Sequence, residues 1–256
     1  MHLPVNTFKH AISRGQRQIG LWSGLGSATA AEIVGGSGFD WIVIDTEHAP
    51  NELAGVIEQL RAMAAGTAAP VVRPAWNDRV LMKRYLDAGA QTLLIPFVQT
   101  ADEAAHAVGS MRYPPRGQRG VGLAHRANRY GRVERYFELA ESELCLLVQI
   151  ETRAALGALE AIAGTDGVDG VFIGPSDLAA DFGHLGNNGH PEVQDAIADA
   201  LERCRRAGKP AGILTGVVVD AERYIDMGFT FVAVGSDVGL LRSASERLRE
   251  RFKRSG

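Results

Sequence analysis

Two carboxylates follow two successive apolar runs of the chain, in a spacing that suits a hard divalent cation. Glu151 comes directly after the run 144–150, and Asp177 follows the run 168–173 through a Gly-Pro-Ser turn. The Ala- and Leu-rich segment 153–164 between them is typical of a helix, so the runs are predicted to be adjacent parallel strands. Glu151 and Asp177 would then lie side by side at one edge of the sheet, where oxygen ligands suit Mg²⁺ or Mn²⁺. The alternative is that these acids are solvated strand ends.

Short apolar runs alternate with helical segments along the whole chain, and eight such runs can be distinguished. The runs are nearly continuous in apolar residues, which is typical of parallel strands buried on both faces. The repeated strand–helix unit predicts an α/β fold, a TIM-type (β/α)8 barrel formed as a single domain by residues 1–256. The expected strands are Ile19–Ser23, Trp41–Asp45, Pro70–Arg73, Thr92–Pro96, Cys145–Ile150, Gly170–Ile173, Ala211–Leu214 and Phe231–Val234.

Helices are predicted between these strands, several of them beginning at a residue type that favours helix N-termini. The expected helices are Ala28–Gly35, Glu52–Ala65, Asp78–Ala88, Asp102–Met111, Arg153–Ala163, Pro191–Ala207, Asp220–Met227 and Ser243–Lys253. The expected caps are Asn51, Asn77, Thr100 and Thr152.

Because TIM barrels place their reactive groups at the C-terminal strand ends, the residues that follow each predicted strand form the candidate site. Asp45, Glu47 and His48 end the second strand, and Arg73 ends the third. Arg73 offers a planar fork of donors to a carboxylate or to an enolate oxygen, or it forms a salt bridge with Asp45 or Glu47. A histidine beside two acids can transfer protons near neutral pH.

The segment Gly174-Pro175-Ser176-Asp177 is typical of a turn that opens a short helix. The first amides of a helix have no intrahelical acceptor, so the amides of Ser176 and Asp177 could bind a small carboxylate. The side chain of Asp177 would turn back towards the metal. These groups together predict an enzyme for a small anionic substrate.

Composition and charge disfavour several other classes of protein. A net charge of −3 gives no reason to expect nucleic acid or a membrane surface as a partner. The two cysteines indicate neither a disulfide framework nor a zinc site. No secretion signal or membrane span is recognisable, so a cytoplasmic location is expected.

Two kinds of catalytic site are also disfavoured. None of the four lysines follows a predicted strand, which disfavours a Schiff-base mechanism. No P-loop or complete dinucleotide fingerprint is present.

The connection from Arg112 to Glu143 is too long for a simple helix-to-strand loop, and it is rich in arginine between Arg116 and Arg132. Long ordered loops in compact domains are usually functional or lie at interfaces. These arginines are expected to meet an anionic substrate or a neighbouring subunit, and the sequence favours neither.

At these residues the chain resembles the HpcH/HpaI family of metal-dependent, pyruvate-yielding aldolases, of the 4-hydroxy-2-oxoheptanedioate aldolase type. The resemblance covers nearly the whole chain and is strongest in three blocks, FDWIVIDTEHAPN at 39–51, VQIET at 148–152 and IGPSDL at 173–178. It implies a TIM-type barrel that exchanges its last helix between subunits and assembles as a homo-hexamer built from dimers.

The resemblance also implies a role for each candidate residue. Glu151 and Asp177 would hold Mg²⁺, Mn²⁺ or Co²⁺, and Arg73 would contact the keto oxygen of pyruvate. His48 would act with a metal-bound water as the base. Asp87 matches an aspartate that pairs with this histidine from an adjacent subunit. The remaining matches are Asp45 and Gln149 as supporting residues and Trp22, Gly174, Pro175, Ser176 and Leu214 as substrate-binding residues.

The implied activity is the reversible cleavage of a 4-hydroxy-2-oxo acid to pyruvate and an aldehyde, as in aromatic compound catabolism. Candidate aldehydes are succinic semialdehyde, tartronate semialdehyde and lactaldehyde-type compounds, and the sequence chooses neither among them nor among the metals. Ser176 stands where relatives commonly have alanine, which leaves the fine substrate preference open. Two alternatives are a CoA-thioester lyase of the citrate lyase β-subunit type and a non-catalytic metal- and carboxylate-binding barrel.

Overall fold

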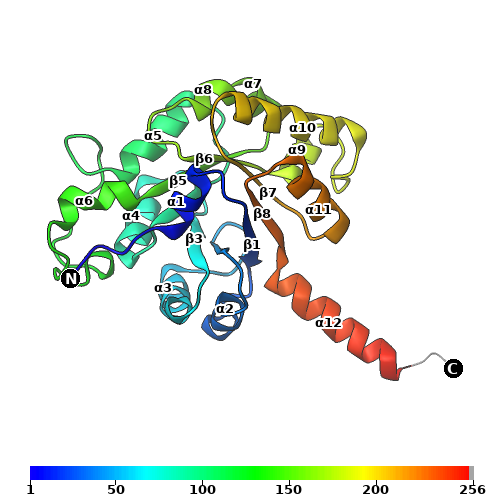
Figure 1. The fold of residues 1–256 in the computed structure, drawn as a ribbon, viewed down its shortest axis with the longest axis horizontal. Coiled ribbons are helices and arrows are strands. Elements are labelled where there is room, and N and C mark those ends of the chain that lie inside the picture. Colours follow the sequence, from blue (N-terminus) through cyan, green and yellow to red (C-terminus); the bar gives the residue numbers. More distant parts are fainter. Residues whose placement is uncertain (254–256) are drawn as a thin grey trace.

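The computed structural model describes residues 1–253, in which eight parallel strands close into a barrel (Figure 1). Each strand pairs with the next one in the chain, and β8 pairs with β1. The predicted TIM-type barrel is confirmed, and each predicted strand agrees with the observed one to within two residues. The strands are β1 (Gln18–Ser23), β2 (Trp41–Asp45), β3 (Ala69–Arg73), β4 (Thr92–Ile95), β5 (Cys145–Ile150), β6 (Gly170–Ile173), β7 (Ala211–Leu214) and β8 (Phe231–Ser236).

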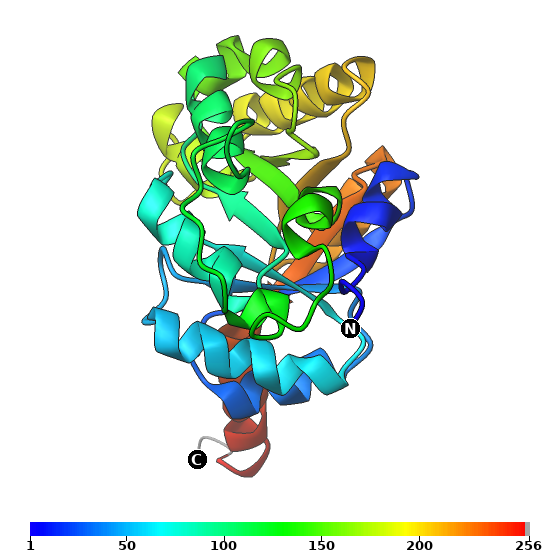
Figure 2. The same cartoon turned by 90° about the vertical axis from the view of Figure 1, so that its left-hand side faces the viewer.

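Helices surround the barrel, and all the predicted helices are present in some form (Figure 2). None of the helices within residues 1–253 has both the length and the apolar character that crossing a membrane requires. The helical elements are α1 (Thr7–Ser13), α2 (Ala28–Gly35), α3 (Leu53–Ala62), η1 (Met63–Ala65), α4 (Arg79–Ala88), α5 (Ala101–Met111), η2 (Arg126–Asn128), α6 (Tyr136–Glu143), α7 (Arg153–Gly157), α8 (Leu159–Ala163), α9 (Pro175–Asp181), α10 (Pro191–Arg206), α11 (Val218–Met227) and α12 (Asp237–Phe252).

Two helix predictions need correction, and two helices lack a prediction. The helix predicted at Arg153–Ala163 is broken at Ala158, whose φ of −106° and ψ of 9° separate α7 from α8. The last helix begins at Asp237 instead of Ser243, because the Ser236 hydroxyl accepts the Gly239 N–H and caps α12 there. Helices α1 and α6 were not predicted at all.

Aromatic side chains fill the N-terminal half of the barrel, and α1 closes that end. The ring of Phe8 lies 5.4 Å from that of Trp41 and 5.6 Å from that of Phe231. A Cβ atom at Gly20 would collide with the Trp41 ring, and one at Gly212 would collide with the Phe231 ring. Burial of Phe8 alone contributes about 2 kcal/mol to stability. The closed end leaves the C-terminal strand ends as the accessible mouth of the barrel.

Helix α12 projects away from the barrel (Figure 1). Of its residues 237–252, only Asp237 is buried. Val238, Leu241, Leu248 and Phe252 are exposed, and their spacing places them on one stripe of the helix. An isolated chain therefore leaves an apolar helix face in water.

Candidate active site

The C-terminal strand ends open into a cleft of about 670 Å³. The segments 186–189 and 214–217 form part of its wall, together with Phe172 and Asp220. Asp45 and Glu151 are buried and contact residues of this wall. The predicted site residues that line the cleft are Trp22, His48, Arg73, Gln149, Gly174, Pro175, Ser176, Asp177 and Leu214.

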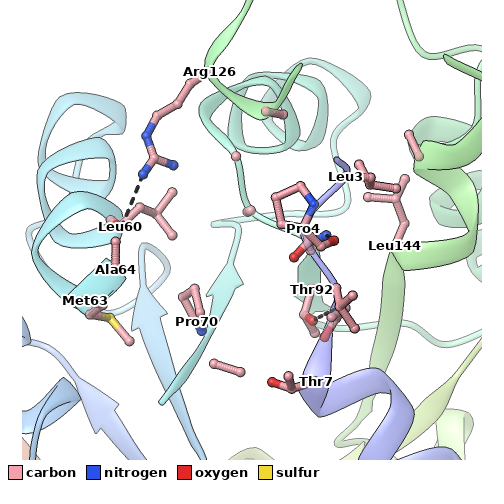
Figure 3. A pocket seen from close by; sticks show the side chains of 18 of the residues that line it. Leu3, Pro4, Thr7, Leu60, Met63, Ala64, Pro70, Thr92, Arg126 and Leu144 are labelled. Carbon is pink, nitrogen blue, oxygen red and sulfur yellow. Dashed lines mark hydrogen bonds between the residues drawn. The ribbon is translucent and has the colours of Figure 1, made fainter. Parts of the chain in front are cut away.

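A second cavity, of about 380 Å³, lies at the opposite end of the barrel (Figure 3). It is enclosed by the N-terminal segment around Pro4, by η1 and by the beginnings of β3 and β4. Arg126 reaches into this region and donates to the carbonyl oxygen of Leu60 over 3.4 Å. Among its lining residues in the described chain, none has a carboxylate or an imidazole, so the cleft at the strand C-termini is the candidate active site.

Two carboxylates hold Arg73 in the wall of the cleft. Its Nε and Nη2 donate to Oδ1 and Oδ2 of Asp45 over 2.9 and 2.7 Å, and its Nη1 lies 2.7 Å from Oε2 of Glu47. The Trp22 ring lies 5.0 Å from the guanidinium carbon, and its Nε1 donates to Asp45 over 3.3 Å. The expected salt bridge is thus present with both acids. These ion pairs also fix the orientation of the Arg73 guanidinium in the cleft wall, where it can donate hydrogen bonds to a substrate.

The two acids differ in their electrostatics. Burial raises the pKa of Asp45, but the hydrogen bonds and the charge of Arg73 outweigh burial and hold that pKa below its ordinary value. The pKa of Glu47 is raised by burial, and the charges of Asp45 and Asp177 act in the same direction. The sequence indicated Glu47 only as an acid beside His48 and a salt-bridge partner of Arg73. Its position two residues after Asp45, at the same strand end, was the available signal.

Glu151 is 1% exposed and is held at the rim by donors from two directions. Its Oε1 accepts the backbone N–H of Phe97 over 2.8 Å, and its Oε2 accepts a hydrogen bond from the Gln149 amide. Ile150 pairs with Ile173 across β5 and β6, so Glu151 lies against Gly174. A Cβ atom at Gly174 would collide with the Glu151 carboxylate, which explains a glycine at this position.

The surroundings of Glu151 fit a divalent cation. Burial raises the pKa of Glu151 to about 7, and the charges of Asp177 and Glu47 add to this effect. A cation relieves the repulsion among such acids and restores the ionised form. Oε1 of Gln149 is buried and has no hydrogen-bond partner within residues 1–253. An oxygen-only donor set of this kind suits Mg²⁺ or Mn²⁺.

Ser176 and Asp177 lie in the first turn of α9, as predicted. Gly174 is the N-cap and Pro175 the first helical residue, so the next amides have no intrahelical acceptor. The Ser176 hydroxyl accepts a hydrogen bond from the Asn188 amide over 3.1 Å. This bond ties the helix start to the segment 186–189 of the cleft wall.

The structure does not bring His48 and Asp87 together within one chain. The His48 side chain is 67% exposed, and its Nε2 lies 3.9 Å from Glu47 Oε1. Asp87 lies in the last turn of α4, which precedes β4 and ends at the opposite end of the barrel. There it accepts a hydrogen bond from Arg119 over 2.7 Å, with Nε2 of His125 at 3.8 Å. His48 and Asp87 therefore do not form a pair within the described chain.

The long connection 112–143 lies at the same end as Asp87, because it joins the end of α5 to the start of β5. It contains η2 and α6, and none of residues 112–143 lines the cleft. Its arginines therefore do not meet a substrate in the cleft of their own subunit. The expectation that these arginines meet an anionic substrate is therefore not met within one subunit.

The metal-free protein is expected to lose stability as the pH rises, because of Glu151. Folding raises the pKa of this carboxyl from 4.5 to about 7. Its contribution to stability is therefore complete below its unfolded pKa and is lost as the pH rises through its folded pKa. The difference corresponds to about 3 kcal/mol in the free energy of unfolding. Urea unfolding at about pH 5 and about pH 8 measures this change.

Glu151→Gln should reduce that pH dependence, whereas Glu58→Gln on the exposed face of α3 should leave it unchanged. Equal pH dependence in the Glu151→Gln variant and the unmodified protein would show that Glu151 is not the group responsible.

Comparison with known proteins identifies the family. The HpcH/HpaI aldolase/citrate lyase family matches residues 18–244. The pyruvate aldolase of Rhizobium etli is 58% identical over 252 residues, which are 98% of this chain and 99% of that protein. The 4-hydroxy-2-oxo-heptane-1,7-dioate aldolase of Salmonella typhimurium is 54% identical and covers 96% of this chain and 94% of its own.

A solved structure gives the same result for the fold. An HpcH/HpaI aldolase/citrate lyase family protein from Burkholderia cenocepacia superposes with a TM-score of 0.94 and is 41% identical, covering 97% of this chain and 100% of that one. The three blocks that suggested the resemblance lie, as expected, at the ends of β2, β5 and β6 around one cleft. The chain therefore belongs to the HpcH/HpaI aldolase/citrate lyase family.

Proposed function

We propose that this protein is a class II aldolase that reversibly cleaves 4-hydroxy-2-oxo acids to pyruvate and an aldehyde. It is a carbon–carbon lyase whose substrates are small oxo acids such as 4-hydroxy-2-oxoheptanedioate. The main structural support is the oriented guanidinium of Arg73 in a cleft beside the buried carboxylate of Glu151. The names of its relatives, a pyruvate aldolase and a 4-hydroxy-2-oxo acid aldolase, support the same reaction class.

Glu151 and Asp177 are the proposed ligands of the metal, which is Mg²⁺, Mn²⁺ or Co²⁺ and supplies Lewis-acid polarisation of the substrate when bound. Arg73 donates to the keto oxygen and stabilises the negative charge that develops there as the enolate forms. Its fork is already held by Asp45 and Glu47, so little reorganisation accompanies the reaction. The amides of Ser176 and Asp177 hold the substrate carboxylate.

His48 is the proposed proton-transfer group. It accepts the proton of the C4 hydroxyl, directly or through water, as the C3–C4 bond breaks and the aldehyde leaves. The electron pair of that bond becomes the pyruvate enolate, and protonation at C3 completes pyruvate. Trp22 and Leu214 form apolar walls of the cleft, and the Asn188-bonded Ser176 hydroxyl lies in the same wall.

The proposed functional unit is an oligomer in which a neighbouring subunit completes each cleft. Asp87 and the connection 112–143 lie together at the end of the barrel away from their own cleft, which supports a contact of theirs with a neighbouring subunit. The exposed apolar stripe of α12 supports the exchange of this helix between two subunits, as its burial requires a partner surface. A homo-hexamer remains the proposed assembly.

Subunits that carry His48→Asn and subunits that carry Asp87→Asn are expected to complement each other. Each variant alone should be nearly inactive, because every cleft lacks one partner of the pair. In randomly mixed oligomers about a quarter of the clefts, half times half, receive both native side chains. Co-expression with two affinity tags, followed by activity measurement on the doubly tagged fraction, tests this expectation.

Co-expression of His48→Asn with Arg73→Lys provides the control, because both residues line the same subunit's cleft and no mixed cleft is complete. Recovery in the control, or no recovery in the test pair, would contradict the exchange of Asp87 between subunits.

Leu241→Asp with Leu248→Asp is expected to reduce the oligomer to smaller species, because charged groups replace the centre of the apolar stripe. Sedimentation velocity gives the mass of the assembly. Glu250→Lys, on the opposite side of α12, is the matched control and should leave the assembly intact. An unchanged mass in the leucine variant would contradict the role of α12 in assembly.

Pyruvate release from several 4-hydroxy-2-oxo acids, which differ in the group beyond C4 that leaves as the aldehyde, tests the proposed function. Metal-stripped protein should release pyruvate only after Mg²⁺, Mn²⁺ or Co²⁺ is added, as followed with a coupled dehydrogenase. Release that requires a CoA thioester would favour the citrate lyase β-subunit type of reaction. Measurable pyruvate binding without turnover of any of these acids would favour a non-catalytic barrel.

A further inference from the structure

His184, His190 and Glu192 form a compact group on the loop between α9 and α10 and the first turn of α10. One ligand-type atom from each side chain lies within 4.8 Å of the other two. Nε2 of His184 is 2.8 Å from Oε2 of Glu192. The two imidazole rings are stacked, with centroids 3.4 Å apart and planes inclined by 17°. None of the three side chains lines the cleft or has a part in the proposed aldol chemistry.

We propose that this group, termed the His–His–Glu site, is a second metal site that binds a transition metal such as Zn²⁺. Two imidazole nitrogens and one carboxylate are a donor set that zinc accepts readily, with water as a fourth ligand. Mg²⁺ prefers oxygen donors and retains its water, so it is a poor occupant. The oxygen-only ligands Glu151 and Asp177 have the opposite preference. The two sites therefore differ in the metal that they select.

The ligands are held in place before a metal arrives. His190 is the N-cap of α10, and its Nδ1 accepts the N–H of Glu192 over 3.3 Å. The backbone N–H of His184 donates to the carbonyl of Ala179 over 2.7 Å, which fixes the start of the loop to α9. A metal bound at Nε2 of His184 takes the place of the proton that this nitrogen donates to the Glu192 carboxylate, so the ion replaces an existing hydrogen bond.

Little movement is needed to admit the ion. With zinc–nitrogen and zinc–oxygen distances of about 2.0–2.1 Å in a tetrahedral site, two ligand atoms lie about 3.3 Å apart. The pair His184–Glu192 therefore has to open by only about half an ångström from its present hydrogen bond. A competing cation, Arg153, lies 3.7 Å from the other oxygen of Glu192. That ion pair is solvent-exposed, so it opposes binding only weakly.

Metal binding would stiffen one wall of the active cleft. His184 and His190 flank the segment 186–189, which lines the cleft. Asn188 in this segment donates to the Ser176 hydroxyl, and its carbonyl accepts from Gln194 of α10 over 2.5 Å. An ion held by both histidines would join the two ends of the segment. We therefore assign the site a structural role in the part of the cleft wall that the segment 186–189 forms.

Calorimetric titration with Zn²⁺ in the variant Glu151→Gln with Asp177→Asn tests the site, because this background lacks the proposed aldolase ligands. The expected result is one Zn²⁺ bound per chain and no heat with Mg²⁺. His184→Ala or His190→Ala in that background should weaken Zn²⁺ binding by about tenfold or more. His106→Ala, an exposed histidine on α5, is the matched control and should bind Zn²⁺ as the background does.

A parallel titration of the native protein in excess Mg²⁺, with and without His184→Ala, covers the case in which the double variant does not fold. Zn²⁺ should also raise the thermal midpoint of the native protein but not that of His184→Ala, because a ligand bound only to the folded state stabilises it. The proposal is overturned if no Zn²⁺ binds in the Mg²⁺-saturated protein. It is equally overturned if binding survives unchanged in both histidine variants.

Discussion

Replacement of Arg73 by lysine is expected to lower kcat for pyruvate formation by about 10²–10³-fold. Lysine keeps the positive charge but loses the planar fork that lies between Asp45 and Glu47, so the donor no longer points at the keto oxygen. Because the same interaction stabilises the enolate, the exchange of pyruvate methyl protons with solvent should fall with cleavage. Steady-state kinetics and proton exchange by NMR measure the two effects.

The fold must be monitored in this variant, because Arg73 is the partner of the buried Asp45 carboxylate. Loss of the partner of a buried charge costs about 3–5 kcal/mol, which lysine should reduce in part. Arg61→Lys is the matched control, since Arg61 forms an exposed pair with Glu58 on α3. Normal exchange in a folded Arg73→Lys protein would contradict the role of Arg73 in enolate stabilisation.

Glu151→Gln combined with Asp177→Asn is expected to abolish tight binding of Mn²⁺ at the cleft and to lower activity by about 10³-fold or more with every metal. The loss of a Lewis acid worth several kcal/mol of transition-state stabilisation sets this scale. The fold should persist, because the amides keep the shape of the side chains. At about pH 8 the free energy of unfolding of the metal-free variant should even rise, since a buried charge has been removed.

Asp220→Asn separates the loss of a ligand from the loss of any carboxylate at the cleft. Asp220 also lines the cleft, where it pairs with Arg223, and has no proposed contact with the metal. Its variant should bind Mn²⁺ as the native protein does. An unchanged Mn²⁺ titration in the double variant would show that the metal ligands lie elsewhere.

The barrel and most of the cleft could be predicted from the sequence because both follow from short-range patterns. Strands buried on both faces appear as apolar runs, and the polar residue after each run lies at the barrel mouth. The caps show where such patterns become ambiguous. Thr100 and Thr152 cap their helices as predicted, but Asp78 and not Asn77 caps α4. Asn51 is buried and donates to the carbonyl of Asp45 instead of capping α3.

The features that could not be predicted, one hydrogen bond at the site and two helices elsewhere, have no recognisable pattern in the neighbouring sequence. The donor from Phe97 to Glu151 is a backbone N–H, which every residue except proline has, so the side chain gives no hint of it. Helix α1 is short, and its Phe8 is buried only because the barrel end is shaped to receive it. Helix α6 lies within an arginine-rich connection, and its buried Tyr136 and Ala140 belong to a small cluster against which Leu3, from the beginning of the chain, packs.

The arrangement of subunits depends on the shapes of their surfaces, which the hydrophobic pattern of the sequence does not predict. An apolar stripe on α12 indicates a partner, but neither the number of subunits nor the identity of the aldehyde follows from it. The Ser176 hydroxyl and the segment 186–189 form part of the cleft wall, so these are the positions where substrate preference should be explored first.

Exchange of the pyruvate methyl protons with solvent deuterium tests the central claim most directly, because it requires enolate formation but no knowledge of the aldehyde. Metal-stripped protein is incubated with pyruvate in deuterium oxide and the methyl signal is followed by NMR. The proposed function predicts that the signal decays after Mg²⁺ or Mn²⁺ is added and stops decaying after chelation. A stable methyl signal with each of these metals, in protein that demonstrably binds pyruvate, would contradict the assignment of an aldolase site.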